Sequence, residues 1–280
     1  MNGSPPTKRL APKALLLAYL ALGCSACGGS DDAATSNDRS SGCGQESTIG
    51  VTNRSIDVGG VERTYVLSVP FAYDPDTPLP VVFVWHGRTD SGAIARGYLG
   101  IEEAANENAI FVYPDGLPIE DGDTAWDVTP DGTDVAFFDN LVATLSAEYC
   151  VATRRVFAAG VSFGGYFTHR LGCSRADVLR AIAPVASGLP WPLGTCSNGI
   201  AAWMAHGESD EVVTFADGET ARDRWVANDG CTDISRPTEP PPCVAYQGCT
   251  VGQPVHWCAY EGGHVWPDFA AEAIWQFFAR

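Results

Sequence analysis

Lysine is almost absent from this 280-residue chain. Its two lysines, Lys8 and Lys13, both lie near the amino terminus, and the 34 acidic residues outnumber the 17 lysines and arginines. The formal net charge of −17 opposes binding to the phosphates of nucleic acid and to anionic membrane surfaces, so we expect neither as a partner. Long hydrophobic runs are missing as well, because the apolar stretch 14–22 is too short to span a bilayer as a stable anchor.

The short apolar stretch instead predicts a signal peptide over residues 1–23, since positive charges precede it and a small residue follows it. The segment resembles a bacterial lipoprotein signal with Cys24 as the lipidated residue, and Cys27 or ordinary cleavage are the alternatives. Removal of the signal would change the formal net charge from −17 to −20. We therefore expect an extracellular or cell-envelope protein whose only membrane contact is a lipid anchor.

Residues 24–42 are rich in Gly, Ser, Asp and Asn, which predicts a flexible tether. The remaining residues 43–280 suffice for one well-buried domain and are too few for two. Eight cysteines behind an export signal predict four disulfides. A hairpin near residue 250 would pair Cys243 with Cys258. The spacing of the cysteines does not match that of a zinc site, and we expect no metal. The eight cysteines of the domain are Cys43, Cys150, Cys173, Cys196, Cys231, Cys243, Cys249 and Cys258.

Apolar patterns predict strands that alternate with helices through the domain. This alternation is typical of a mostly parallel sheet covered by helices on both faces, an α/β three-layer sandwich. Ligands of such sheets bind beyond the carboxyl ends of the strands. The predicted strands are 64–70, 81–85, 109–113, 156–159, 180–185, 200–205 and 255–260, and the predicted helices are 101–108, 135–149, 163–172, 218–228 and 268–278.

The segment 160–164 has the pattern Gly-x-Ser-x-Gly and stands between a predicted strand and a predicted helix. The pattern alone is weak in a chain with 30 glycines, but its position between strand and helix is specific. A residue forced into such a turn adopts a strained backbone, and glycine neighbours leave room for it. We therefore predict that Ser162 is a nucleophile, raised above the sheet at the start of a helix whose free amides favour negative charge.

A serine nucleophile needs a histidine as base and an acid that orients the histidine. His264 follows the last predicted strand among glycines, and a late histidine matches the order serine, acid, histidine of α/β-hydrolases. Asp210 follows the strand 200–205 and is the predicted acid, with Glu208 as the alternative. Each could instead be an ordinary loop residue.

An oxyanion hole requires two amides, and we predict those of Phe163 and Arg88. The Arg88 guanidinium is expected to face solvent or to bind an acidic group of the substrate. Trp126 and Trp266 are expected either to form aromatic walls around a substrate or to pack in the core.

These motifs follow the same order as in the extracellular polyhydroxybutyrate depolymerase and feruloyl esterase group of carbohydrate esterase family 1, which the chain resembles over 55–280. The shared segments are 86–87, 113–116, 134–137, 160–165, 206–210 and 263–267. Arg88 and Phe163 depart from the residues common in that group, and we expect these departures to affect the pocket wall and not the chemistry.

The resemblance implies an α/β-hydrolase fold, the triad Ser162, Asp210 and His264, and a secreted serine esterase without cofactor. Its substrate would be a polyhydroxybutyrate-type polyester or a feruloyl or acetyl ester of plant polysaccharide. The alternatives are a peptidase of the same fold and an inactive binding protein at the cell surface. We expect a monomer.

Overall fold

The structure of the protein is a computed structural model that describes residues 1–4, 38–196 and 198–280. The chain divides into two units, Met1–Ala33 and Ala34–Arg280. The lipidation candidates Cys24 and Cys27 and most of the expected signal peptide lie outside the described residues. Among the described residues, no helix combines the length and apolar character needed to cross a membrane.

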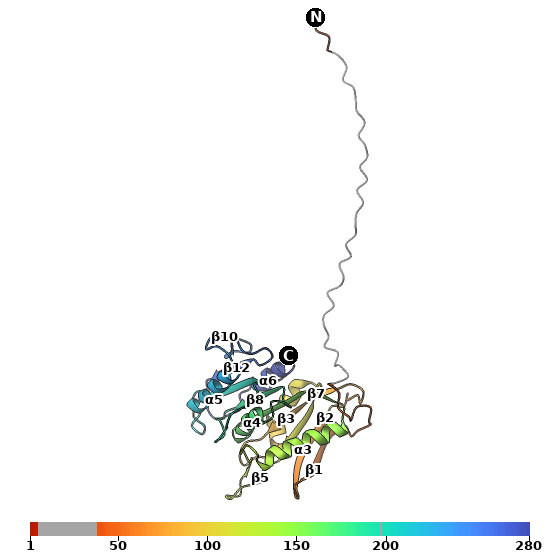
Figure 1. The fold of residues 1–280 in the computed structure, drawn as a ribbon, viewed down its shortest axis with the longest axis vertical. Helices are drawn as coiled ribbons and strands as arrows, with labels where there is room; N and C mark the ends of the chain where they lie inside the picture. The colour runs from red at the N-terminus through yellow and green to blue at the C-terminus, as the bar shows by residue number, and fades with distance from the viewer. Residues whose placement is uncertain (5–37, 197) are drawn as a thin grey trace. The chain divides into compact units, whose positions relative to one another are not determined.

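A ten-stranded sheet forms the centre of the second unit (Figure 1), in the order β1-β2-β4-β3-β7-β8-β9-β12-β11-β10. Neighbouring strands from β4 to β12 run parallel, and the two strands at each edge pair antiparallel. The strands are β1 (Gly50–Val58), β2 (Val61–Val69), β3 (Leu79–Trp85), β4 (Ile110–Pro114), β7 (Val151–Val161), β8 (Ala181–Val185), β9 (Ala201–Gly207), β10 (Ser235–Pro237), β11 (Cys243–Tyr246) and β12 (Val255–Tyr260). A separate two-stranded hairpin joins β5 (Leu117–Pro118) to β6 (Thr124–Ala125).

Helices cover both faces of the sheet, because alternate residues of the buried strands point to opposite sides. Phe83 and Trp85 pack in the cluster that includes α3, α4 and α5, whereas Val82 and Val84 pack with α1, α2 and α6. The expected three-layer α/β sandwich is confirmed. The helices are α1 (Gly92–Tyr98), α2 (Ile101–Ala105), α3 (Thr133–Glu148), α4 (Phe163–Ser174), α5 (Phe215–Asn228) and α6 (Ala270–Phe278).

Each predicted strand and helix is present, most with shifted ends, but six elements had not been predicted. Two of them, β5 and β6, have only two residues each. β1 and the short β10 lie at the two sheet edges. β1 alternates exposed and half-buried residues that are mostly polar, and β10 is exposed throughout, so neither has an apolar run. β11 and the seven-residue helix α1 are too short to give a periodic signal. Edge strands depend on pairing with a neighbour that the local sequence does not reveal.

The expected tether at 24–42 is too long, because the packed domain already begins before residue 43. Ser40 is buried, and its amide donates to the carbonyl of Val151 at 3.0 Å. The Ser40 hydroxyl also accepts a hydrogen bond from the Val151 amide at 2.8 Å. Residues 39–40 thus pair with the start of β7 through an antiparallel bridge between Arg39 and Ala152.

The eight cysteines of residues 43–280 form the four disulfides that were predicted. Cys243 and Cys258 face each other on β11 and β12, which confirms the pair predicted from the hairpin. The Cys43–Cys150 bridge connects residues 107 apart and ties the start of the domain to the start of β7. The other two bridges are Cys173–Cys196 and Cys231–Cys249.

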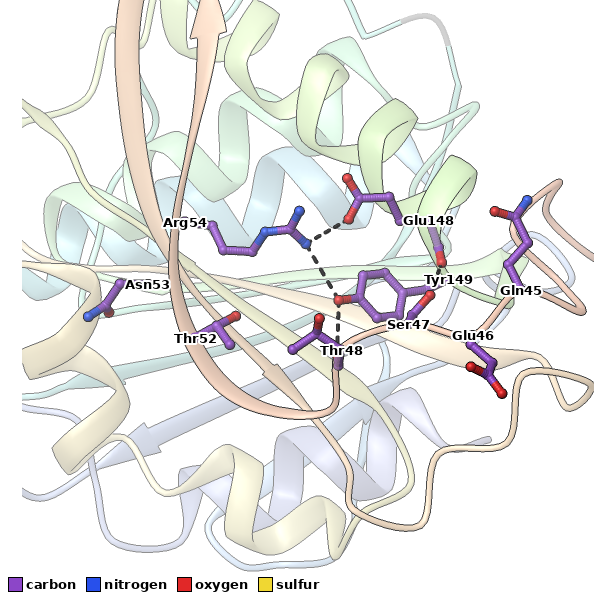
Figure 2. A pocket seen from close by; sticks show the side chains of 9 residues that line it. All are labelled: Gln45, Glu46, Ser47, Thr48, Thr52, Asn53, Arg54, Glu148 and Tyr149. Carbon is purple, nitrogen blue, oxygen red and sulfur yellow. Dashed lines mark hydrogen bonds and ion pairs between the residues drawn. The ribbon is translucent and has the colours of Figure 1, made fainter.

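A polar groove of about 480 Å³ lies between β1 and the end of α3 (Figure 2). Arg54 pairs with Glu148 at 2.7 Å and lies 3.5 Å from the Tyr149 hydroxyl, which donates to the Thr48 carbonyl. This network links the edge strand to the helix. Because α3 ends just before β7 begins, the groove lies at the amino end of that strand, opposite to Ser162.

Asp229, directly after α5, is a buried carboxylate with few partners. Its Oδ1 accepts from the Ile200 amide and from the Asn228 side chain, each at 3.1 Å. Oδ2 has no hydrogen-bond partner among the described residues. Burial disfavours the charged form and raises the pKa of Asp229 to about 6.

The raised pKa of Asp229 predicts a pH-dependent stability. The folded protein binds the proton more tightly than the unfolded chain, so the unfolding free energy falls as pH rises from about 4 to about 6. Asp229→Asn should remove this fall and, at pH 7.5, raise the unfolding free energy by about 2 kcal/mol. Denaturant titrations at pH 4.5, 6.0 and 7.5 measure the unfolding free energy of both proteins. The exposed Asp233→Asn is the control, and an unchanged pH slope in Asp229→Asn would contradict the prediction.

Candidate active site

Ser162 occupies a strained turn between β7 and α4, with φ 54° and ψ −120°. Such a conformation persists only where the surrounding structure enforces it. A Cβ on Gly160 would lie 2.4 Å from the Gly164 carbonyl oxygen, and one on Gly164 would lie 2.1 Å from the Trp85 oxygen. The Gly-x-Ser-x-Gly pattern therefore allows the turn to pack against β3.

The three residues predicted from separate segments converge at this turn. The Ser162 hydroxyl lies 2.7 Å from His264 Nε2, and His264 Nδ1 lies 2.8 Å from Asp210 Oδ2. Ser162 follows β7, Asp210 follows β9 and His264 follows β12. Parallel strands bring these loops to one sheet edge. Glu208, the alternative acid, is exposed, and the histidine contacts Asp210 instead.

Asp210 is held in place by hydrogen bonds to both of its carboxylate oxygens. Oδ1 accepts from the amides of Val212 and Val213, each at 2.9 Å. Burial opposes the charged form, but the hydrogen bonds from His264 and the two amides outweigh it and lower the pKa of Asp210. The carboxylate therefore stays ionised at neutral pH.

His206 is a second imidazole beside Asp210. Its Nε2 lies 2.9 Å from the Val213 carbonyl oxygen and 3.3 Å from Asp210 Oδ2, and the side chain is buried. On its other side Nδ1 packs so tightly against α5 that a Cβ on Gly218 would lie 2.3 Å away. The sequence analysis placed His206 only within the shared segment 206–210 and did not predict its contact with Asp210.

The segment 86–90 after β3 is fixed by buried hydrogen bonds. His86 Nε2 accepts from the Gly116 amide at 2.9 Å, which leaves Nδ1 to donate to the Gly87 carbonyl at 2.6 Å. Burial lowers the pKa of His86, so the ring is neutral. Trp126 Nε1 donates to the His86 carbonyl at 2.9 Å. The backbone beside Arg88 is thereby held against the loop 115–126.

Arg88, which lines the same pocket as Ser162, and Phe163, which follows Ser162 in the chain, have free backbone amides. Neither amide donates to another backbone group within the described ranges. Phe163 begins α4, and the first amides of a helix have no partner within it. The Arg88 guanidinium is already engaged within the protein, because it pairs with Asp121 and, at 2.7 Å, with Asp123.

Trp126 is not a substrate wall, in contrast to one of the expectations for it. The ring is 3% exposed and packs between Trp85 and Phe167, at centroid distances of 5.0 and 5.6 Å. The indole of Trp126 is oriented into the core, where its Nε1 donates a hydrogen bond to the His86 carbonyl. Trp266, by contrast, lines a pocket of about 560 Å³ that contains Ser162.

The site has the parts that acyl transfer requires: a hydroxyl, an imidazole within hydrogen-bond reach, an ionised acid and two unpaired amides. The described residues hold no cluster of three or more metal-ligating side chains. This geometry on a parallel sheet with helices on both faces is that of the serine hydrolases with the α/β-hydrolase fold.

Comparisons with known proteins support this class. Over 271 residues the chain is 32% identical to feruloyl esterase D of Neurospora crassa, covering 86% of this chain and 90% of that protein. It is 34% identical to feruloyl esterase C of Emericella nidulans, over 85% of this chain and 90% of that one. No family model matches. The chain belongs to the feruloyl esterase family, and it is a carboxylic ester hydrolase.

Solved structures confirm the fold. The acetyl xylan esterase from Aspergillus awamori superposes with a TM-score of 0.67 at 15% identity, over 81% of this chain and 99% of that one. A ferulic acid esterase superposes with a TM-score of 0.55 at 16% identity, over 82% of this chain and 96% of that one. The esterase relatives also decide against the peptidase that the motif alone had left open.

The close approach at Gly164 predicts that Gly164→Ala is strongly destabilising. Its methyl group would meet the backbone of β3, which cannot move without disturbing the sheet. We expect the unfolding free energy to fall by about 3 kcal/mol. Gly97→Ala is the matched control, because nothing lies within 4 Å of its Cβ in helix α1. Denaturant titration compares them, and equal stabilities would show that the turn tolerates a side chain.

Proposed function

We propose that the protein hydrolyses feruloyl or acetyl esters of plant polysaccharide through an acyl-enzyme on Ser162. The observation that carries this is the continuous contact from Ser162 through His264 to Asp210. The names of the relatives favour an aromatic or acetyl ester over a polyhydroxybutyrate-type polyester. The pocket around Ser162, about 560 Å³, is large enough for one aromatic acyl group.

In the first step His264 Nε2 takes the proton of the Ser162 hydroxyl as Oγ bonds to the ester carbonyl carbon. Asp210 accepts a hydrogen bond from Nδ1–H without taking the proton, so it fixes the ring and stabilises the imidazolium. The amides of Arg88 and Phe163 donate to the carbonyl oxygen as it becomes negative. The ester C–O bond then breaks and the leaving alcohol takes the proton from Nε2.

In the second step water replaces the alcohol. His264 accepts a proton from water, whose oxygen bonds to the acyl carbon, and the tetrahedral oxyanion again lies at the two amides. Breakdown releases the acid and returns the proton to Ser162. This chain's own residues carry each proton in the cycle.

We further propose that the protein works outside the cytoplasm. Four disulfides are typical of an oxidising compartment. Anchoring through a lipid on Cys24 and a monomeric state remain predictions. Mass spectrometry of the mature amino terminus tests the anchor, and size-exclusion chromatography with light scattering tests the monomer.

Replacement of the nucleophile is the direct test of the mechanism. Ser162→Ala should reduce kcat for methyl ferulate and p-nitrophenyl acetate by at least about a thousandfold, because no other group can form the acyl-enzyme. A fluorophosphonate probe should label the wild-type protein and not the variant. Melting curves check that the variant is folded. Turnover or labelling that persists in a folded Ser162→Ala would refute the assignment.

His206 provides a second test, of how the acid is held. His206→Gln should lower kcat about tenfold and leave KM nearly unchanged, because Asp210 would lose a neighbour that fixes its position. His256→Gln is the matched control: that histidine is also buried on the sheet and packs against Phe277 instead. Steady-state kinetics on p-nitrophenyl acetate compares the two. Equal losses would mean that His206 contributes only to packing.

A further inference from the structure

Trp191 presents its indole to solvent, with 91% of its surface exposed. The other seven tryptophans of the chain are buried or half-buried. Close to Trp191 in the chain, Pro190 and Leu193 are buried, so the loop that carries the indole is itself packed. A single exposed apolar residue is ordinary on a protein surface, but a tryptophan that projects from a packed loop is not.

The loop 188–196 is attached to helix α4 at several points. Arg170 of α4 is only 1% exposed, and it donates to the Leu193 carbonyl at 2.8 Å and to the Pro192 carbonyl. The Cys173–Cys196 disulfide ties the end of the loop to the same helix. The backbone next to the exposed indole is therefore fixed before any ligand arrives.

The loop starts beside the nucleophile. It follows β8, which pairs in parallel with β7, the strand that leads to Ser162. A Cβ on Gly188 would lie 3.1 Å from the Tyr166 hydroxyl oxygen, so Tyr166 packs directly against the start of the loop. The rings of Tyr166 and Phe163 are 6.1 Å apart. Two half-exposed aromatic residues thus lead from Ser162 to the loop that carries Trp191.

This surface is separate from the pocket that contains Ser162. The described residues that line the pocket do not include Phe163, Tyr166 or Trp191. Phe163 packs with the core cluster under α4, whereas Trp266, which lines the pocket, packs with the cluster on the other face of the sheet. The pocket and the surface with Trp191 therefore extend from the nucleophile on different faces of the sheet.

The spacing along α4 indicates the size of a ligand that could use both. Arg170, which holds the loop, stands eight residues after Ser162, or about 12 Å along the helix axis. A ligand that contacts both Ser162 and Trp191 must therefore be longer than a single acyl group. In a polysaccharide ester the sugar chain provides that length, and it has to lie outside a pocket that holds one acyl group.

The charges around the loop favour a neutral ligand. The two guanidiniums that reach the loop are engaged by its carbonyls, since Arg224 donates to the Gly194 carbonyl at 2.8 Å as Arg170 does to its neighbours. The net charge of −17 opposes a polyanion. An indole face is broad, flat and apolar, and it matches the face of a sugar ring, where C–H groups are exposed and the hydroxyls point outward to water.

We propose that Trp191 is a docking platform for a neutral sugar ring of the polysaccharide chain whose ester lies at Ser162. This inference rests on the proposed function and places part of substrate binding outside the catalytic pocket. Because the loop is already fixed, little conformational entropy is lost when the sugar stacks on the indole. The contact acts on the chain and not on the reacting atoms, so it should lower KM for polymeric substrates.

The experiment measures kcat and KM on feruloylated arabinoxylan and on methyl ferulate. In Trp191→Ala the ratio of kcat/KM on the polymer to that on the small ester should fall about fivefold, mainly through KM, because one stacking contact is lost. Trp191→Phe keeps an aromatic face and should lose about twofold. Melting curves of both variants should match the wild type, since the indole is 91% exposed.

Phe71→Ala is the matched control. Phe71 is also an exposed aromatic residue, at 75%, but it follows β2 at the edge of the sheet opposite to Ser162. Its loss should leave the ratio unchanged.

A binding measurement separates docking from turnover. On the inactive Ser162→Ala background, affinity electrophoresis in arabinoxylan gives a dissociation constant, which Trp191→Ala should raise about fivefold. Polygalacturonate, an anionic polymer, should bind neither protein. Adsorption to a polyhydroxybutyrate film tests the alternative ligand, an apolar polyester.

The contrary outcomes are distinct from one another. An unchanged ratio together with unchanged arabinoxylan binding in Trp191→Ala would overturn the platform and leave the esterase mechanism intact. Equal losses on the polymer and on methyl ferulate would mean that Trp191 only supports the loop. Adsorption to the polyester that depends on Trp191, without such binding to arabinoxylan, would overturn the sugar as ligand. A folded wild-type protein that cleaves neither ester would overturn the proposed function, whereas weaker arabinoxylan binding in Trp191→Ala would still support the platform.

Discussion

The packing of the Ser162 turn against the backbone of β3 is the contact on which the site depends. Gly164 allows that approach, since a Cβ there would overlap the backbone at the end of β3, and Gly160 lets α4 approach β7, since its Cβ would overlap the Gly164 carbonyl. The turn holds Ser162 at a positive φ, and the first amide of α4 is left unpaired above it. A strained conformation of this kind costs about 1–3 kcal/mol and persists because β7, α4 and β3 are all fixed by the surrounding sheet.

A second constraint is the attachment of the segment after β3 to the loop 115–126. Neutral His86 bridges the two, and Thr89, at φ 70°, donates its amide to the Thr124 carbonyl at 3.0 Å. Trp126 completes this attachment from the core. The same contacts fix the backbone that carries Arg88 and Asp90, two residues that line the pocket containing Ser162.

The limits of sequence-based reasoning are visible in particular residues. His264 and Asp210 could be found because each follows an apolar strand and stands in the expected chain order. Trp126 could not be placed, because a tryptophan in an acidic loop has the same local pattern whether it faces a substrate or the core. The contact of His206 with Asp210 was also hidden, since it depends on how the chain turns between them and on the close packing of Gly218.

The amino-acid sequence by itself determined the layered α/β fold, the nucleophile turn, the order of the triad and the pairing of Cys243 with Cys258. Those features depend on periodicity, glycine placement and chain order, which are local or nearly local properties. Only the tertiary structure decided that Arg88 pairs with Asp121 and Asp123 and that Asp90 shares a pocket with Ser162. Such contacts join segments far apart in the chain, and their distances are set by how the helices and loops pack on the sheet.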